Sequence, residues 1–176
     1  MKYVFCRMDT GEEMFLQRDL VECVDYRLGD HRVRQIIPYV VVVDAGKVSL
    51  FRRKRGDKRL VDGFTIGTGG HVEPGDLYGN RHDILFNAAA REVKEELGAD
   101  IKSLTMTNIA IESDATEVDR VHLGVVFVVE LTKAPVCADD ELEWNGWKTF
   151  SELDLYELES WSEIIRKDLA KWISIK

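Results

Sequence analysis

The hydrophobic positions of the chain predict strands first and helices later. Ile36–Val43 is a continuous apolar run in which β-branched residues predominate, which is typical of a strand buried on both faces. Residues 44–46 then give a turn signal, and Lys47–Arg53 follows as a second apolar stretch. Residues 36–53 therefore predict a β-hairpin whose first strand is fully buried.

Further elements are expected on both sides of this hairpin. Strands are predicted at 2–8, 59–61, 64–68, 100–112, 120–131 and 146–150, whereas 12–34 carries no clear pattern. One helix is predicted from about 88 to 97, with Asn87 as its N-cap and Gly98 as its C′ residue. Two more are expected after Ser151 and Ser160. This irregular alternation predicts an α/β (α+β) fold with a mixed sheet between helices.

Composition narrows the classes of function. The chain has 176 residues and a net charge of −8, which favours one soluble domain and argues against binding to nucleic acid or to an anionic membrane. No apolar run approaches 18 residues, so we expect no membrane span. Three widely spaced cysteines, Cys6, Cys23 and Cys137, indicate reduced thiols and hence a cytoplasmic location.

Candidate chemistry gathers on the first predicted helix. It carries Glu92, Glu95 and Glu96, whose side chains fall within an arc of roughly 100° because successive helical residues are about 100° apart. Like charges so placed repel one another, whereas a hard divalent cation with oxygen ligands would hold them together. The pattern predicts a site for Mg²⁺ or Mn²⁺. An ordinary solvated acidic face is the alternative interpretation.

Together, the turn Gly70–Asp76 and the helical segment Arg91–Gly98 resemble the Nudix box, Gly-x5-Glu-x7-Arg-Glu-U-x-Glu-Glu-x-Gly-U, in which U is apolar. Asp76 stands where the family usually has Glu, and 14 residues rather than seven separate it from Arg91. We interpret the extra residues as a surface insertion, 77–86, packed by Leu77, Ile84, Leu85 and Phe86. Other stretches are similar to a branch of MutT-like predicted phosphoesterases, namely 37–41, 59–60, 64–72 and 121–127.

The resemblance implies an α/β/α sandwich in which the box forms a loop–helix–loop. It places the family domain at 36–176, with 1–35 as an N-terminal extension. It also implies a metal-dependent hydrolase that cleaves a phosphoanhydride bond in a nucleoside-diphosphate-linked or other diphosphate-containing small molecule. The alternative is a non-catalytic module that binds a nucleotide derivative. A homodimer is expected because Nudix proteins are often dimers.

The resemblance also assigns roles to individual residues. Glu92, Glu95 and Glu96 are the expected metal ligands, together with a backbone carbonyl of Gly70, and Arg91 is expected to orient the glutamates. Glu92 is either a ligand or the general base, and Glu141 is a further candidate ligand or base by its spacing to Trp147, with an acidic solvated loop as the alternative interpretation. Substrate phosphates could be contacted by Arg53, Arg59 and His71. A solvated hairpin tip for the arginines and a turn-stabilising histidine are the alternatives.

Overall fold

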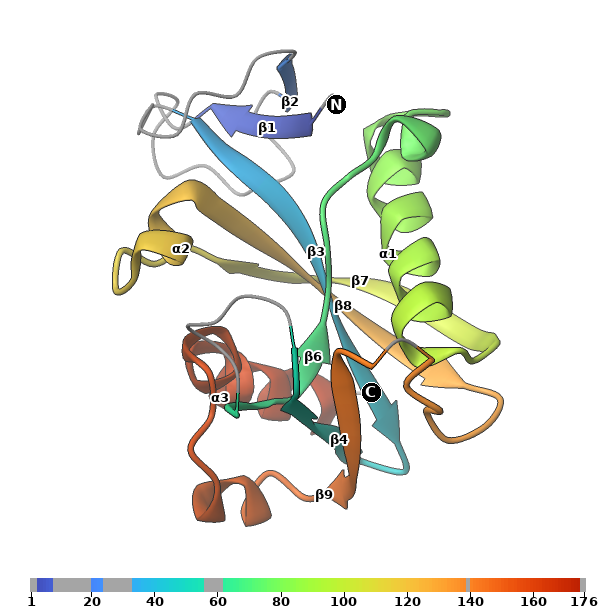
Figure 1. Ribbon diagram of the computed structural model, residues 1–176, viewed down its shortest axis with the longest axis vertical. Helices are drawn as coiled ribbons and strands as arrows, with labels where there is room; N and C mark the ends of the chain where they lie inside the picture. Colours follow the sequence, from blue (N-terminus) through green and yellow to red (C-terminus); the bar gives the residue numbers. More distant parts are fainter. Residues whose placement is uncertain (1–2, 8–19, 24–32, 56–61, 139, 175–176) are drawn as a thin grey trace.

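A mixed β-sheet forms the middle layer of the protein, with helix α1 (Arg81–Leu97) on one face and helix α3 (Ser160–Ser174) on the other (Figure 1). This arrangement confirms the expected α/β/α sandwich. The computed structural model describes residues 3–7, 20–23, 33–55, 62–138 and 140–174. Among these residues, no helix combines the length and apolar character needed to cross a membrane.

The strands that the structure describes range from 2 to 12 residues in length. In chain order the strands are β1 Tyr3–Arg7, β2 Leu20–Cys23, β3 Val33–Asp44, β4 Lys47–Arg53, β5 Phe64–Thr65, β6 Gly67–Thr68, β7 Ile101–Ile111, β8 His122–Leu131 and β9 Leu142–Lys148. A short helix and two 3-10 turns complete the elements: α2 Glu117–Val121, η2 Pro74–Asp76 and η3 Glu152–Leu155.

Strand β3 is the centre of the sheet. It pairs in parallel with β8, from Gln35 opposite His122 to Val42 opposite Val129, and antiparallel with β1, β4 and β6. β7 is antiparallel to β8, and β4 also pairs with β5 and β9. The coexistence of parallel and antiparallel pairs confirms the predicted mixed sheet.

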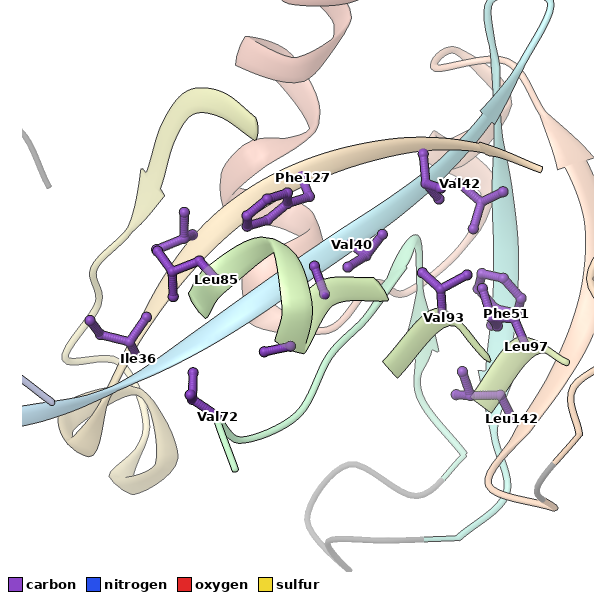
Figure 2. Close-up of a cluster of buried hydrophobic side chains, with 14 of the residues drawn as sticks. Ile36, Val40, Val42, Phe51, Val72, Leu85, Val93, Leu97, Phe127 and Leu142 are labelled. Atoms are coloured by element: carbon purple, nitrogen blue, oxygen red, sulfur yellow. The ribbon is translucent and has the colours of Figure 1, made fainter. Parts of the chain in front are cut away.

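Strand β3 contributes to both hydrophobic cores because alternate side chains face opposite sides of a sheet. Its even-numbered apolar residues lie beneath α1 and its odd-numbered ones beneath α3. Figure 2 shows the first core, in which Leu85 of α1 lies near Ile36 of β3, and Val93 and Leu97 of α1 lie beside Phe51 of β4. Complete burial of one such side chain contributes about 1.5–3 kcal/mol, so these two cores hold both helices against the sheet.

Helix α1 begins seven residues earlier than expected, and the interpretation of 77–86 as a separate surface insertion is wrong. The side chain of Asn80 accepts a hydrogen bond from the backbone N–H of Asp83 (3.3 Å), and that of Asp83 accepts one from Asn80 (2.8 Å), which marks the start of the helix. The insertion thus supplies the first turns of α1, and Leu85 is only 1% exposed in the core. Asn87 lies inside the helix.

Other boundaries agree more closely. The strands predicted at 100–112 and 120–131 correspond to β7 and β8, and the hairpin of β3 and β4 is confirmed. The last strand lies at 142–148 rather than 146–150, and the helix after Ser151 is only the 3-10 turn η3. Helix α2 and strand β2 were not predicted, and the segment 59–61 lies outside the described residues. The domain boundary at residue 36 stays a prediction.

Candidate active site

The three glutamates of α1 differ in their surroundings. Helix α1 buries one apolar stripe against the sheet, and Glu92 and Glu96 lie at the edge of this stripe. Only 7% of the surface of Glu92 and 9% of that of Glu96 is exposed to solvent. The side chain of Glu95 is 59% exposed. The glutamates therefore do not form one solvated helix face, because two of them are enclosed between the helix and the loop that precedes it.

Arg91 joins that loop to the helix. Its Nη1 donates hydrogen bonds to Glu92 Oε1 (2.7 Å) and Glu95 Oε2 (2.9 Å), and its Nη2 donates to the carbonyl of His71 (2.7 Å). Burial lowers the pKa of Arg91, but the hydrogen bond to Asp76 and the charge of Glu92 outweigh it, so the pKa is raised. One guanidinium thus fixes both the loop and two of the candidate ligands.

Asp76 reaches Arg91 despite its shorter side chain. Its Oδ2 lies 3.1 Å from Nη2 of Arg91, and it also accepts a hydrogen bond from the backbone N–H of Glu73 at 2.8 Å. The carboxylate is almost completely buried. The missing methylene is compensated by the 3-10 turn η2, which carries Asp76 and brings its backbone close to α1.

The loop before the helix touches the glutamates through glycine. A Cβ at Gly70 would lie 2.3 Å from Oε1 of Glu92, and one at Gly69 would lie 2.1 Å from the carbonyl oxygen of Pro38. A side chain at Gly69 would collide with backbone, and one at Gly70 would force the Glu92 carboxylate to move, because real Cβ contacts are essentially never that short. The backbone at Gly70 is therefore held directly against the carboxylate of Glu92.

The two buried glutamates are held in different ways. Burial raises the pKa of Glu92, although the charge and hydrogen bond of Arg91 oppose that effect. Glu96 accepts a hydrogen bond from the hydroxyl of Thr68, which lies on β6. A cation beside these carboxylates would favour their charged forms and offset the cost of burying them.

The oxygen atoms gathered here are suited to form part of the coordination shell of a hard divalent cation. Glu92, Glu95 and Glu96 offer only carboxylate oxygens, and Gly70 adds backbone that approaches Glu92 without a side chain between them. Within the described ranges, no three His, Cys, Asp or Glu side chains are already grouped to hold a metal ion. Mg²⁺ is commonly bound by one or two carboxylates, with water and substrate phosphates completing its octahedral shell. The arrangement suits that mode of binding.

A cavity of about 440 Å³ opens beside Glu96. It lies over the face of the sheet that carries α3, with Ile37 and Tyr39 of β3 among its walls. The structure brings four further predicted site residues to it: Arg53, Gly70, His71 and Glu141. Glu92, Glu95 and Arg91 are not among its lining residues, and Arg59 lies outside the described part of the chain.

Several residues of the cavity were not predicted from the sequence. Trp161, at the start of α3, packs edge-to-face on Tyr39 with ring centroids 5.7 Å apart. His122 lies 5.9 Å from His71 between ring centroids, and the pKa of His71 is lowered by partial burial and by the charges of His122 and Arg91. Glu159 binds Arg53. Their positions depend on long-range packing, which no local motif signals.

Comparison with known proteins agrees with this geometry. The family model described as the NUDIX domain matches residues 33–169. Protein YmaB of Bacillus subtilis (strain 168) is 31% identical over an alignment of 146 residues, and the match covers 77% of this chain and 71% of that protein.

Two crystal structures are similar over most of their length. That of Tm1382, assigned to the Nudix hydrolases, is 26% identical and has a TM-score of 0.77, covering 98% of this chain and 100% of that one. The MutT NUDIX hydrolase from Burkholderia pseudomallei is 21% identical with a TM-score of 0.60, covering 75% and 95%, and supports the fold. With a family model that matches most of its length, this chain belongs to the NUDIX domain family.

Proposed function

We propose that the protein is a metal-dependent hydrolase that cleaves a phosphoanhydride bond in a diphosphate-containing small molecule, such as a nucleoside diphosphate linked to a second group. The observation that carries this proposal is the placement of Glu92 against Gly70 and of Glu96 against Thr68, with Glu96 at the wall of the cavity. Family membership supports hydrolysis as the type of reaction.

Glu92 and Glu96 would hold Mg²⁺ or Mn²⁺, with Glu95 and the carbonyl of Gly70 as further ligands. Such an ion supplies charge neutralisation for phosphate oxygens and lowers the pKa of a bound water. Arg91 has a different task in this proposal. By holding Glu92, Glu95 and the carbonyl of His71 together, it fixes the distance between the helix and the loop, so that the ligands need little rearrangement.

The cavity would hold the rest of the substrate. Glu141 lines it and is our candidate for the group that accepts a proton from the attacking water, with Glu92 as the alternative base. Arg53 and His71 line the same cavity and would donate hydrogen bonds to phosphate oxygens. Arg59 is proposed for the same task.

A substrate screen tests the proposal. The purified protein is incubated with Mg²⁺ or Mn²⁺ and nucleotide sugars, dinucleoside polyphosphates, ADP-ribose and oxidised nucleoside triphosphates, and the products are separated by chromatography. We expect at least one compound to be cleaved, and Glu96→Gln to abolish that cleavage. If wild type and Glu96→Gln give no product from any compound but bind one of them, the protein is a binding module instead.

We further propose that the protein acts in the cytoplasm and as a homodimer. Light scattering coupled to gel filtration tests the second point, since a homodimer doubles the mass of 20.2 kDa.

A further inference from the structure

Arg53 and Glu159 form an ion pair inside the cavity wall. The Nε of Arg53 donates a hydrogen bond to Oε1 of Glu159 at 2.9 Å, and the two side chains are 15% and 9% exposed. The residues are 106 positions apart, so the pair exists only in the folded chain. Neither a strand pattern nor a helix cap requires it.

Both partners are hydrogen-bonded to one short segment, residues 63–64, at the start of β5. The backbone N–H of Arg53 donates to the carbonyl of Gly63 (3.0 Å), and that of Glu159 donates to the carbonyl of Phe64 (2.8 Å). In addition, the carbonyl of Glu159 accepts the hydrogen bond from Glu163 that opens α3 (3.0 Å). Because Gly63 and Phe64 are consecutive, the two anchors fix the relative position of the arginine and the glutamate.

The hydrogen bond through Nε restricts the orientation of the Arg53 guanidinium but does not use its two terminal nitrogens. Arginine has five N–H donors in a rigid plane, and four of them are on the two terminal nitrogens. Among the residues that the structure describes, the side chain of Arg53 makes its one hydrogen bond through Nε. Nη1 lies 4.0 Å from Oε2 of Glu141, and Arg53, Glu96 and Glu141 line the same cavity.

A planar fork held at its base matches the oxygens of a phosphate group, which accept hydrogen bonds from two N–H donors at once. We propose that Glu159 is a positioning residue, which aims the terminal nitrogens of Arg53 at the phosphate oxygens of a substrate bound beside Glu96. This inference rests on the proposed function, since it takes a diphosphate group as the occupant of the cavity. Glu159 itself does not touch the substrate.

A binding experiment separates positioning from a purely structural role. The probe is methylenediphosphonate with saturating Mg²⁺, a diphosphate analogue whose P–C–P bridge cannot be hydrolysed, and its Kd is measured by isothermal titration. Four proteins form a double-mutant cycle: wild type, Glu159→Ala, Arg53→Ala and the double variant. The control is Glu163→Ala, which removes an exposed carboxylate in the first turn of α3 that pairs only with Arg166 among the described residues.

We expect Glu159→Ala and Arg53→Ala each to raise the Kd about tenfold or more, since a hydrogen bond to a charged group is lost or misdirected. The double variant should bind no more weakly than Arg53→Ala alone, because Glu159 acts through Arg53. Glu159→Gln keeps an acceptor oxygen and should recover part of the affinity. Glu163→Ala should bind like wild type.

Three results would overturn the inference: an unchanged or lower Kd in Glu159→Ala, losses that multiply in the double variant, or no binding of the probe by wild type. Thermal unfolding of each variant identifies any loss of binding that is caused by unfolding. If Glu159→Ala is unfolded, Glu159→Gln is compared with wild type instead. Coupled losses without hydrolysis of any diphosphate would refute the proposed function alone. Normal hydrolysis with uncoupled losses would refute only the role of Glu159. On a cleaved substrate, Glu159→Ala should raise KM more than it lowers kcat.

Discussion

Arg91 and Asp76 form an ion pair between helix α1 and the loop before it, with Nη2 of Arg91 3.1 Å from Oδ2 of Asp76. The 14 residues that separate them in the sequence do not prevent this contact, because α1 packs against the 3-10 turn η2, where Asn87 also donates a hydrogen bond to the carbonyl of Asp76. The pair connects the two halves of the site, so its loss should affect both stability and chemistry.

Asp76→Asn tests the stability of this connection. The substitution keeps the shape of a nearly buried side chain but removes the charge that Arg91 faces, so we expect a loss of about 2 kcal/mol in the free energy of unfolding. Urea unfolding monitored by circular dichroism measures it. Asp168→Asn, in an exposed pair with Lys171, is the matched control and should change stability by less than about 0.5 kcal/mol. Equal losses in both variants would contradict the prediction.

The close approach of the loop to Glu92 can be tested with two glycines of the same segment. Gly70→Ala would drive a Cβ into the Glu92 carboxylate, whereas a Cβ at Gly75 meets nothing within 4 Å. We expect Gly70→Ala to lower turnover about a hundredfold, because a ligand displaced by about 1 Å is misaligned for the reaction. Gly75→Ala should retain full activity. Similar rates for the two variants would show that the position of Glu92 is not critical.

Glu96→Gln probes the metal ligands directly. Glutamine has the same size and can still accept the hydrogen bond from Thr68, so the melting temperature should change little. Turnover should fall by more than about a hundredfold. Substitution of a residue that only orients a metal ligand lowers activity by about a hundredfold at most, so a larger loss would indicate a direct ligand. Mn²⁺ titration followed by electron paramagnetic resonance should show weaker binding. Lys94→Gln, on the exposed side of α1, is the control, and its activity should equal that of wild type.

Tyr39 provides a pH-dependent prediction. Burial, followed by the charge of Glu159, raises its pKa from about 10 to about 12, so the folded protein disfavours the phenolate. The unfolded chain releases this proton first, and the contribution of Tyr39 is therefore complete below pH 10 and lost as the pH rises to 12. The two-unit shift corresponds to roughly 3 kcal/mol.

Urea unfolding between pH 8 and pH 12 tests this with Tyr39→Phe. At pH 8 the variant should be less stable than wild type, since it lacks the hydrogen bonds to Thr65 and Ser162. The difference in stability should shrink by roughly 3 kcal/mol toward pH 12, because phenylalanine does not ionise. A constant difference across this range would show that Tyr39 is not the titrating group.

The elements that could be predicted from the sequence are those with strong local signals. The run Ile36–Val43, the turn after it and the C-terminal glycine of α1, Gly98 at φ +59°, each combine a hydrophobic pattern with a residue suited to the turn. The start of α1 was misplaced because Asn87 resembles a cap. In the structure its Nδ2 donates to the carbonyls of Asp76 and Tyr78 instead, and a side chain used for tertiary contact cannot be distinguished from a cap by sequence.

The residues of the candidate site also differ in whether a local sequence signal predicts them. The glutamates and Arg91 follow one another on a helix, so spacing alone groups them. Glu159 and Trp161 reach the cavity only because α3 packs across the sheet onto Tyr39. Helix α2 was missed although Thr116 and Asp119 form a capping box, since the acidic residues around it resemble a solvated loop.

The dual role of β3 limits how the cavity can change. A shift of one residue along this strand would exchange the side chains beneath α1 with those beneath α3, so both layers would lose their packing at once. Ile37 and Tyr39 consequently form a part of the cavity wall whose position cannot change. Any adjustment of the cavity to a larger or smaller ligand must come from its rim, at Thr116 and Val118 or at the first turn of α3, where side chains can be exchanged without moving the sheet.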